Sequence, residues 1–437
     1  MKKPLGGITF LLLALVLASP WFVGGQIESY YNTLIEEARQ EAPQLDFSDR
    51  TYNRGWFSST VTGTLGFNGL FPMEEMPVTV RYESRIVHGP LFWSDLASAP
   101  AGLALDKTHL WIELKEGQEV ESQELVELFK AIPQFNSVSV VTFDRNIATT
   151  FDISAFTKTM DDAEKPFTID FQGMHGTSNY NVVTKEIVFD ATFPRLSFEE
   201  SKDETLFFDN LVLKGSQKGL ENNARYDLAS FAFLSKESGI DVAMKELYIA
   251  AGNNDAGEVY NSYLDSGFQS LKVKDQSYAP AEFSLGLENL DKEALASLKK
   301  SINEAVAKSQ EMGEEMMGMV IMGKVMELLP EFLKRDPKLI IKKIHLGTGK
   351  DQSLDAKGYA TIDGEEAVKL MAGPMFIQAV DAEFEASLPK PFASSVIDPN
   401  RIMFLVGQNI LVAKEDAYTL KAEVKKGRVT INGVPIM

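Results

Sequence analysis

The chain has 437 residues, of which 44% are hydrophobic and 24% charged, and this composition is that of a folded protein large enough for two or three domains. Its 43 Lys and Arg residues against 62 Asp and Glu residues give a formal net charge of -19, which argues against nucleic acid as a partner. The absence of cysteine excludes disulfides, thiolate metal sites and cysteine nucleophiles, and only four histidines are left for metal or base chemistry.

The N-terminus carries an uncharged, largely apolar stretch over residues 4–25, directly after Lys2 and Lys3. About 20 such residues are enough to cross the hydrocarbon core of a bilayer. Because the lysines precede the stretch and Glu28 follows it, the positive-inside rule places the N-terminus in the cytoplasm and the bulk of the chain outside. We therefore expect a transmembrane anchor over residues 1–25 in a bacterial inner membrane, with the bulk in the periplasm. The alternative is a cleaved signal peptide.

Residues 26–43 carry apolar side chains at helical spacing among acidic ones, and Pro43 follows this run. This pattern predicts a juxtamembrane amphipathic helix. Such a helix either packs its apolar face into the core or uses it for dimerisation or for contact with the membrane surface.

From residue 44 to residue 290 the apolar period changes to two. Val78, Val80 and Tyr82 alternate with polar residues, and the same alternation returns over residues 283–287. Such half-buried strands, with turn signals between them and no regular alternation with helices, predict an antiparallel β region. Several strands are apolar at both parities, for example over residues 226–234, so they are either covered by a second layer or line an apolar groove.

Helical spacing returns over residues 291–336, and this region is rich in methionine. The methionines fall about one turn apart at Met312, Met316, Met319, Met322 and Met326, with Met317 beside them. They either pack on the sheet or form an apolar surface for a lipid, a partner or a second copy of the chain. Period two resumes over residues 337–437, and the chain ends in a hairpin around Lys426-Gly427.

The predicted fold class is therefore mainly β with a helical insertion. We expect a large twisted antiparallel sheet or a groove-like β structure after one N-terminal transmembrane helix.

A search for motifs of catalytic, metal or nucleotide sites gives negative results. The four histidines lack metal-ligand spacing. Gly318, Gly323 and Lys324 have the spacing of a Walker A motif, but Val325 replaces the Ser or Thr that would hold magnesium, and the segment continues a helix. We therefore predict no catalytic residue, no metal and no cofactor. An envelope-polymer hydrolase stays as the enzyme alternative.

Three motifs carry a family resemblance. They are Tyr52-Asn53-Arg54-Gly55-Trp56-Phe57-Ser58-Ser59, Ile86-Val87-His88-Gly89-Pro90-Leu91 and the terminal Val429-Thr430-Ile431-Asn432-Gly433. With these motifs and its N-terminal span, the chain resembles the YdgA-like family of bacterial envelope proteins, which has a domain of unknown function and an N-terminal membrane anchor. The resemblance implies an inner-membrane-anchored periplasmic protein without established catalytic residues, and it allows a homodimer.

The same motifs supply candidate ligand-binding residues. Gly55 permits a bend that delivers Trp56 and Phe57 into a strand, and the proline after His88 ends another strand. Arg54 and His88 are the best candidates for a functional polar cluster, although a purely architectural role is the alternative. The full set of predicted ligand-binding residues is Arg54, Trp56, Phe57, His88, Met316, Met319 and Met322.

Together these features favour a non-catalytic periplasmic protein that binds an apolar ligand, such as a lipid, or another envelope component through its β domain. A dimeric structural or regulatory scaffold of the bacterial envelope is the alternative. Because the chain is acidic and lacks a polybasic patch, we expect any lipid contact to be mainly apolar.

Overall fold

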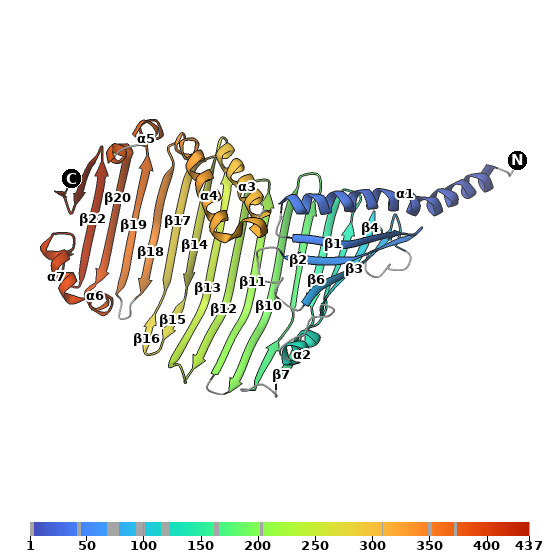
Figure 1. The fold of residues 1–437 in the computed structure, drawn as a ribbon, viewed down its shortest axis with the longest axis horizontal. Coiled ribbons are helices and arrows are strands. Elements are labelled where there is room, and N and C mark those ends of the chain that lie inside the picture. Colours follow the sequence, from blue (N-terminus) through green and yellow to red (C-terminus); the bar gives the residue numbers. More distant parts are fainter. Residues whose placement is uncertain are drawn as a thin grey trace. The chain divides into compact units, whose positions relative to one another are not determined.

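The computed structural model describes residues 4–41, 45–67, 78–92, 99, 101–114, 123–160, 166–201, 204–307, 309–347, 352–370 and 374–436, with the side chains of residues 4–18, 306–315 and 317 among those left out. The fold is mainly antiparallel β with helices, as the sequence predicts (Figure 1). The chain divides into two compact units, here called unit 1 (residues 1–196 and 302–320) and unit 2 (residues 197–301 and 321–437).

Unit 1 is built on an open antiparallel sheet. Its strands are β1 (Leu45–Arg54), β2 (Ser58–Phe67), β3 (Val78–His88), β4 (Ala104–Leu114), β5 (Phe135–Val141), β6 (Asn146–Ile153), β7 (Phe156–Met160), β8 (Phe167–Phe171), β9 (Met174–Asn181) and β10 (Glu186–Ser201), with the short helix α2 (Gln123–Ala131) between β4 and β5. Strands β1 to β6 pair in chain order, β9 follows β6, and β10 pairs with β9 and β8. Neighbouring strands need only short connections in this arrangement.

One face of this sheet is covered by α1, which runs without a break from Pro4 to Glu41. Ile27 of α1 lies in a buried cluster with Val61, Ile86 and Ala104, and Tyr31 packs against it, so this part of the predicted amphipathic helix faces the core. The sequence places an anchor boundary at residue 25, but the helix itself is continuous there. Among the helices of the described residues, none has the length and apolar character needed to cross a membrane.

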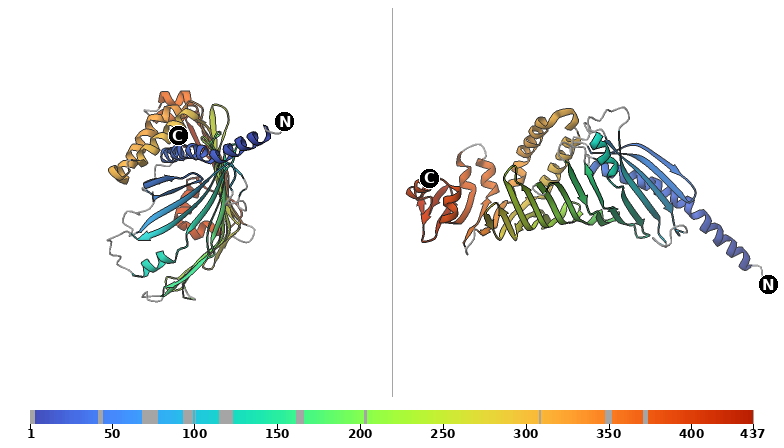
Figure 2. Two further views of the ribbon diagram at one scale, coloured as in Figure 1. Left: turned by 90° about the vertical axis from the view of Figure 1, so that its right-hand side faces the viewer. Right: turned by 90° about the horizontal axis from the view of Figure 1, so that it is seen from below.

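Unit 2 is an up-and-down antiparallel sheet in one curved layer (Figure 2). Its strands are β11 (Glu204–Lys218), β12 (Glu221–Ser235), β13 (Ile240–Asp255), β14 (Val259–Phe268), β15 (Ser270–Val273), β16 (Gln276–Tyr278), β17 (Ala281–Asp291), β18 (Lys338–Gly347), β19 (Ser353–Ile362), β20 (Val380–Pro389), β21 (Val412–Ala413), β22 (Ala417–Lys425), β23 (Arg428–Ile431) and β24 (Val434–Pro435). The main order is β11-β12-β13-β14-β17-β18-β19-β20-β22-β23-β24. The predicted terminal hairpin is β22–β23, which turns at Lys426-Gly427.

In the described part of unit 2, helices separate consecutive strands at three points. The helices are α3 (Lys292–Ala307) and α4 (Ser309–Leu333) between β17 and β18, α5 (Gly364–Leu370) and the 3-10 helix η1 (Pro374–Ala379) between β19 and β20, and α6 (Lys390–Val396) and α7 (Pro399–Gly407) between β20 and β21. The first pair is the insertion that helical spacing predicts. Asp291 caps α3, because its Oδ1 accepts a hydrogen bond of 3.0 Å from the backbone N–H of Ala294.

Candidate functional site

The structure brings Arg54, Trp56 and His88 together where α1 crosses the ends of β1–β3. The Arg54 guanidinium lies 4.4 Å from the ring centroid of Trp21 on α1, and its Nη1 donates a hydrogen bond of 3.0 Å to Oε2 of Glu28. The rings of Trp21 and Trp56 are 5.3 Å apart, and His88 Nδ1 lies 3.3 Å from the carbonyl oxygen of Trp56. Arg54 and His88 therefore lie in one cluster, to which α1 contributes Trp21 and Glu28.

His88 is closed off from solvent. His88 and Ser59 are each 1% exposed, and Nε2 of His88 lies 2.8 Å from the hydroxyl of Ser59. Burial lowers the pKa of His88, and the nearby Arg54 charge acts in the same direction. A serine at hydrogen-bond distance from a histidine is the geometry of a nucleophile and its base, but α1 leaves no room for a substrate, because Gly24 lies directly against the imidazole ring. The pair is a buried structural contact.

Trp56 and Phe57 do not enter a strand, so that expectation is wrong. They lie in the bend between β1 and β2, which is closed by a hydrogen bond of 2.8 Å from the Gly55 N–H to the carbonyl oxygen of Ser58. Their side chains are 50% and 53% exposed, respectively. A tight turn satisfies its own backbone groups and pushes the two rings outward.

A second buried polar group near α1 lies outside all of the sequence motifs. Asp106 of β4 accepts hydrogen bonds from the hydroxyls of Ser84 and Thr108, the latter at 2.9 Å. Burial raises the pKa of Asp106, and the hydrogen bonds from Ser84 and Thr108 oppose this effect. The only sequence signal is parity, because Ser84 shares its strand parity with the buried residues Tyr82 and Ile86.

The predicted methionines lie on α4, and those whose side chains are described are exposed. The exposed fractions are 49% for Met316, 67% for Met319, 63% for Met322 and 58% for Met326, while the side chains of Met312 and Met317 lie outside the described residues. These values favour an exposed apolar surface over a helix face packed on the sheet. The residues named in the Arg54 cluster come from α1, from β1–β3 and from the bend between β1 and β2, and not from α4.

A larger apolar surface, here called the apolar face, runs across the sheet of unit 2. It consists of residues that lie directly opposite one another on neighbouring strands and therefore point to the same side. One row is Ala251, Leu264, Leu285, Ile341, Gly358, Phe384 and Ala422, and a second row is Leu287, Leu339, Ala360, Ala382 and Val424. Neither row contains a charged or hydrogen-bonding side chain.

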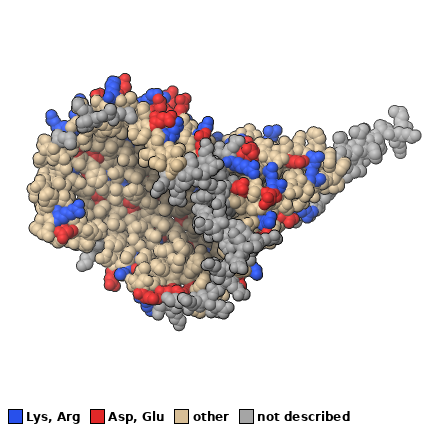
Figure 3. All heavy atoms as spheres, in the orientation of Figure 1, with Lys and Arg blue, Asp and Glu red and all other residues tan. Residues whose placement is uncertain are grey.

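The apolar face is open to solvent. Leu264 and Leu287 are 37% exposed and Leu339 is 44% exposed, although large aliphatic side chains are usually buried. Tyr226 and Ile249, which lie opposite each other on β12 and β13, are also exposed. Figure 3 shows a broad hollow over the strands of unit 2 in which charged side chains are sparse.

The strands that are apolar at both parities belong to this sheet. On β12 the apolar positions change from Tyr226 and Leu228 to Phe231 and Phe233, and the change occurs at the level where Asn210 and Glu246 of the flanking strands take left-handed backbone conformations. Left-handed residues interrupt the regular alternation of side chains along a strand. On β12, the change of apolar parity therefore coincides with a local irregularity in both flanking strands.

The apolar face has no chemistry of its own beyond burial. Its rows hold no acid, base or nucleophile, and no cluster of three or more potential metal ligands occurs among the described residues. Such a surface can bind a ligand by removing apolar area from water, which is worth about 25 cal/mol per Å².

A family model described as "Bacterial protein of unknown function (DUF945)" matches residues 1–437. Searches of the curated proteins and of the solved structures give no match. The family match agrees with the bacterial family of unknown function that the sequence motifs indicate. It does not extend to the YdgA-like name or to membrane anchoring.

Proposed function

This chain belongs to the bacterial family of unknown function DUF945, and we propose that it is a non-catalytic envelope protein that binds lipid acyl chains on the apolar face of unit 2. The observation that carries the proposal is the exposure of Leu264, Leu287 and Leu339 within two uncharged rows of side chains. An exposed apolar surface of this size is unusual unless a ligand or partner covers it.

The dimensions of the apolar face suit an acyl chain. The first row crosses seven strands, from β13 to β22, and six spacings of about 4.8 Å give it a length of roughly 30 Å. A chain that spans one leaflet is about half of the 30 Å hydrocarbon core of a bilayer, so it fits along the row. Each buried methylene group contributes about 0.8 kcal/mol.

The character of the lining favours a lipid over a protein. A protein interface normally combines an apolar centre with hydrogen bonds, at about one for every 100–200 Å². The two rows offer no side-chain donor or acceptor, and an acyl chain needs none. Membrane anchoring is part of the proposal and is supported by the uncharged stretch over residues 4–25 and by the resemblance to the YdgA-like envelope proteins.

Native mass spectrometry of the full chain, purified in mild detergent, tests the proposal. We expect a stoichiometric lipid-sized adduct on the wild type and its loss in Leu339→Asp, because a buried carboxylate would face the acyl chain. Lys338→Asp is the matched control, since it changes the neighbouring residue on the opposite face of β18 and should keep the adduct. A wild-type protein free of lipid, or an undiminished adduct on Leu339→Asp, contradicts the proposal.

A second candidate function is the dimeric scaffold, which the exposed methionines of α4 favour. Flexible thioether side chains adapt to irregular partner surfaces. If the scaffold is correct, the wild type in detergent has twice the mass of the chain and Met319→Glu with Met322→Glu restores the single mass, as measured by light scattering. An unchanged mass in the double variant contradicts the scaffold. The lipid adduct should not respond to these two changes.

A further inference from the structure

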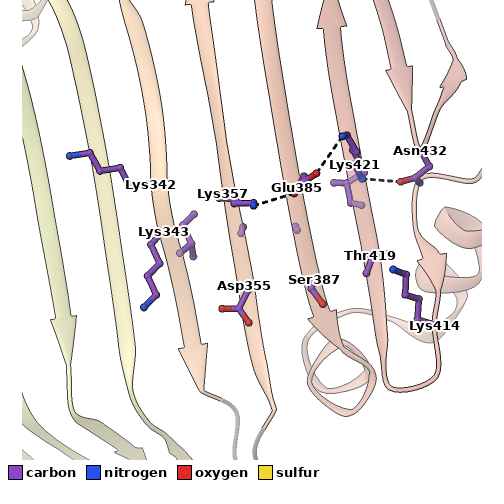
Figure 4. A pocket seen from close by; sticks show the side chains of 14 residues that line it. Lys342, Lys343, Asp355, Lys357, Glu385, Ser387, Lys414, Thr419, Lys421 and Asn432 are labelled. Carbon is purple, nitrogen blue, oxygen red and sulfur yellow. Dashed lines mark hydrogen bonds and ion pairs between the residues drawn. The ribbon is translucent and has the colours of Figure 1, made fainter.

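The polar face of unit 2, opposite the apolar face, contains a hollow of about 490 Å³ that lipid binding does not use (Figure 4). It lies over β18, β19, β20 and β22. Five lysines line it, namely Lys342, Lys343, Lys357, Lys414 and Lys421, against two carboxylates, Asp355 and Glu385. An excess of three positive charges in one hollow is notable in a chain of net charge -19.

The hollow arises from short side chains between long ones. Ser387 and Thr419 lie opposite each other on β20 and β22 and form its floor. The neighbouring rung carries Lys357 on β19, Glu385 on β20 and Lys421 on β22, and these longer side chains form one wall. Two hydroxyl groups are therefore accessible between charged side chains.

Some of the lysine charge is neutralised by carboxylates of the protein. Lys421 lies 2.9 Å from Glu383, 3.4 Å from Glu385 and 3.4 Å from Glu423. This hydrogen bonding to glutamates raises the pKa of Lys421, so its charge is fixed and already balanced. Lys343 is likewise paired with Glu282.

The remaining lysines are not balanced in this way. Lys357 is 3.6 Å from Glu385 and its side chain is 71% exposed, so that pair is weak. Within the described residues, Lys342 and Lys414 form no ion pair. Figure 4 shows Lys414 directed toward Thr419, at the floor of the hollow. Asp355 accepts hydrogen bonds from His345 at 2.7 Å and from Ser353, so its charge is already engaged.

We propose that this hollow binds the phosphate group of a small ligand. The ammonium of Lys414 and that of Lys357 supply the charge, and the hydroxyls of Ser387 and Thr419 donate hydrogen bonds to the phosphate oxygens. A hollow lined by several donors suits a tetrahedral dianion better than a planar carboxylate, and charge-assisted hydrogen bonds are stronger than neutral ones.

The phosphate can belong to a soluble ester or to a lipid headgroup, and the test separates these sources. The full chain in mild detergent and phosphate-free buffer is titrated calorimetrically with glycerol phosphate, and in parallel its binding to vesicles with and without phosphatidic acid is measured by co-sedimentation. Saturable binding of glycerol phosphate identifies the soluble source. Binding to phosphatidic acid vesicles alone identifies the headgroup.

We expect Lys414→Ala to weaken phosphate binding by about tenfold, because it removes a charge-assisted hydrogen bond, and Thr419→Val to weaken it by a smaller factor. Lys414 is exposed, so its loss should leave the fold intact, which the melting temperature checks. Lys425→Ala removes the same charge from the end of β22, outside the hollow, and should change affinity less than twofold. Absence of saturable binding to either probe, or equal weakening by Lys414→Ala and Lys425→Ala, overturns the proposal.

Discussion

The two units differ in whether the apolar side of their antiparallel sheet is covered. In unit 1 the face under α1 is sealed, with exposed fractions of 0% for Val61, 3% for Ile86 and 1% for Ala104. In unit 2 the corresponding rows stay open, and Leu264 and Leu339 are 37% and 44% exposed. The same period-two pattern underlies both faces. A sheet face is therefore buried core or exposed surface according to what covers it, and not according to its own residues.

The sealing of unit 1 depends on how closely α1 approaches the sheet. Gly24 and Gly25 present no side chain at the point of contact, so the His88 ring and the Arg54 guanidinium fit directly against the helix backbone. Any side chain at Gly24 would overlap the imidazole, because a Cβ there would lie 2.4 Å from its Cε1.

The largest expected effect is therefore that of Gly24→Leu, which should convert the sealed face of unit 1 into an open one. We expect a loss of about 3 kcal/mol in the free energy of unfolding, because the ring and the helix must move apart. Urea denaturation followed by tryptophan fluorescence measures it, since Trp21 and Trp56 flank the contact.

Gly318→Ala is the matched control for Gly24→Leu. It adds a methyl group to a helical glycine that has no atom of the described residues within 4 Å of the new Cβ, so it should leave stability unchanged or raise it by up to about 1 kcal/mol. A Gly24→Leu protein as stable as the wild type would show that α1 does not hold the sheet of unit 1 closed.

Truncating one apolar side chain on each face tests directly how much burial on that face contributes to the free energy of unfolding. Val61→Ala empties a site that is 0% exposed and should cost about 2 kcal/mol in the free energy of unfolding. Leu264→Ala removes a larger side chain from the open face of unit 2, yet should cost less than about 1 kcal/mol, because water already reaches the site. Chemical denaturation of both variants provides the values. Similar losses at both positions would mean that the apolar face of unit 2 is covered in solution.

Much of this architecture is predictable from the sequence, and the reason is local periodicity. Alternation over residues 78–82 and 283–287 predicts strands that the structure confirms as β3 and β17, and helical spacing predicts the insertion between β17 and β18. Whether a sheet face is covered by another element is not determined by its local sequence pattern. Whether α1 or nothing lies over a strand depends on contacts between distant segments, so the sequence leaves the choice between a second layer and a groove open.

The candidate site is likewise predictable from the sequence only in part. The neighbourhood of Arg54 and His88 is predictable because their motifs lie at adjoining strand ends: Arg54 is opposite Ser59, and Ser58 is opposite Val87. Their partners on α1 carry no signal, since Glu28 is 26 residues from Arg54. The lysine hollow is also invisible in the sequence, because it forms only when four strands take their register.

The pH dependence of stability is a third way to probe the sealed face. Burial lowers the pKa of His88 below its ordinary value of 6.5, so below that pH the unfolded chain binds more protons than the folded one. Stability should therefore fall as the pH drops from about 7 to 5.5, by up to about 1.4 kcal/mol per pH unit. His88→Gln should flatten this slope in urea denaturation series. Parallel slopes for wild type and variant would mean that His88 is not held neutral beneath α1.

The smallest expected effect compares two arginines with similar contacts, one in each unit. Arg54 joins α1 to the sheet through Glu28 and Trp21, and Arg54→Ala should cost about 1 kcal/mol, because it removes a partly exposed ion pair and a cation–π contact. Arg225 of β12 makes the same two kinds of contact with Asp227 and Tyr248, but within the open sheet. Arg225→Ala should therefore cost less than about 0.5 kcal/mol, since no covering element depends on it. Equal losses in thermal denaturation would show that Arg54 stabilises its own strand and not the attachment of α1.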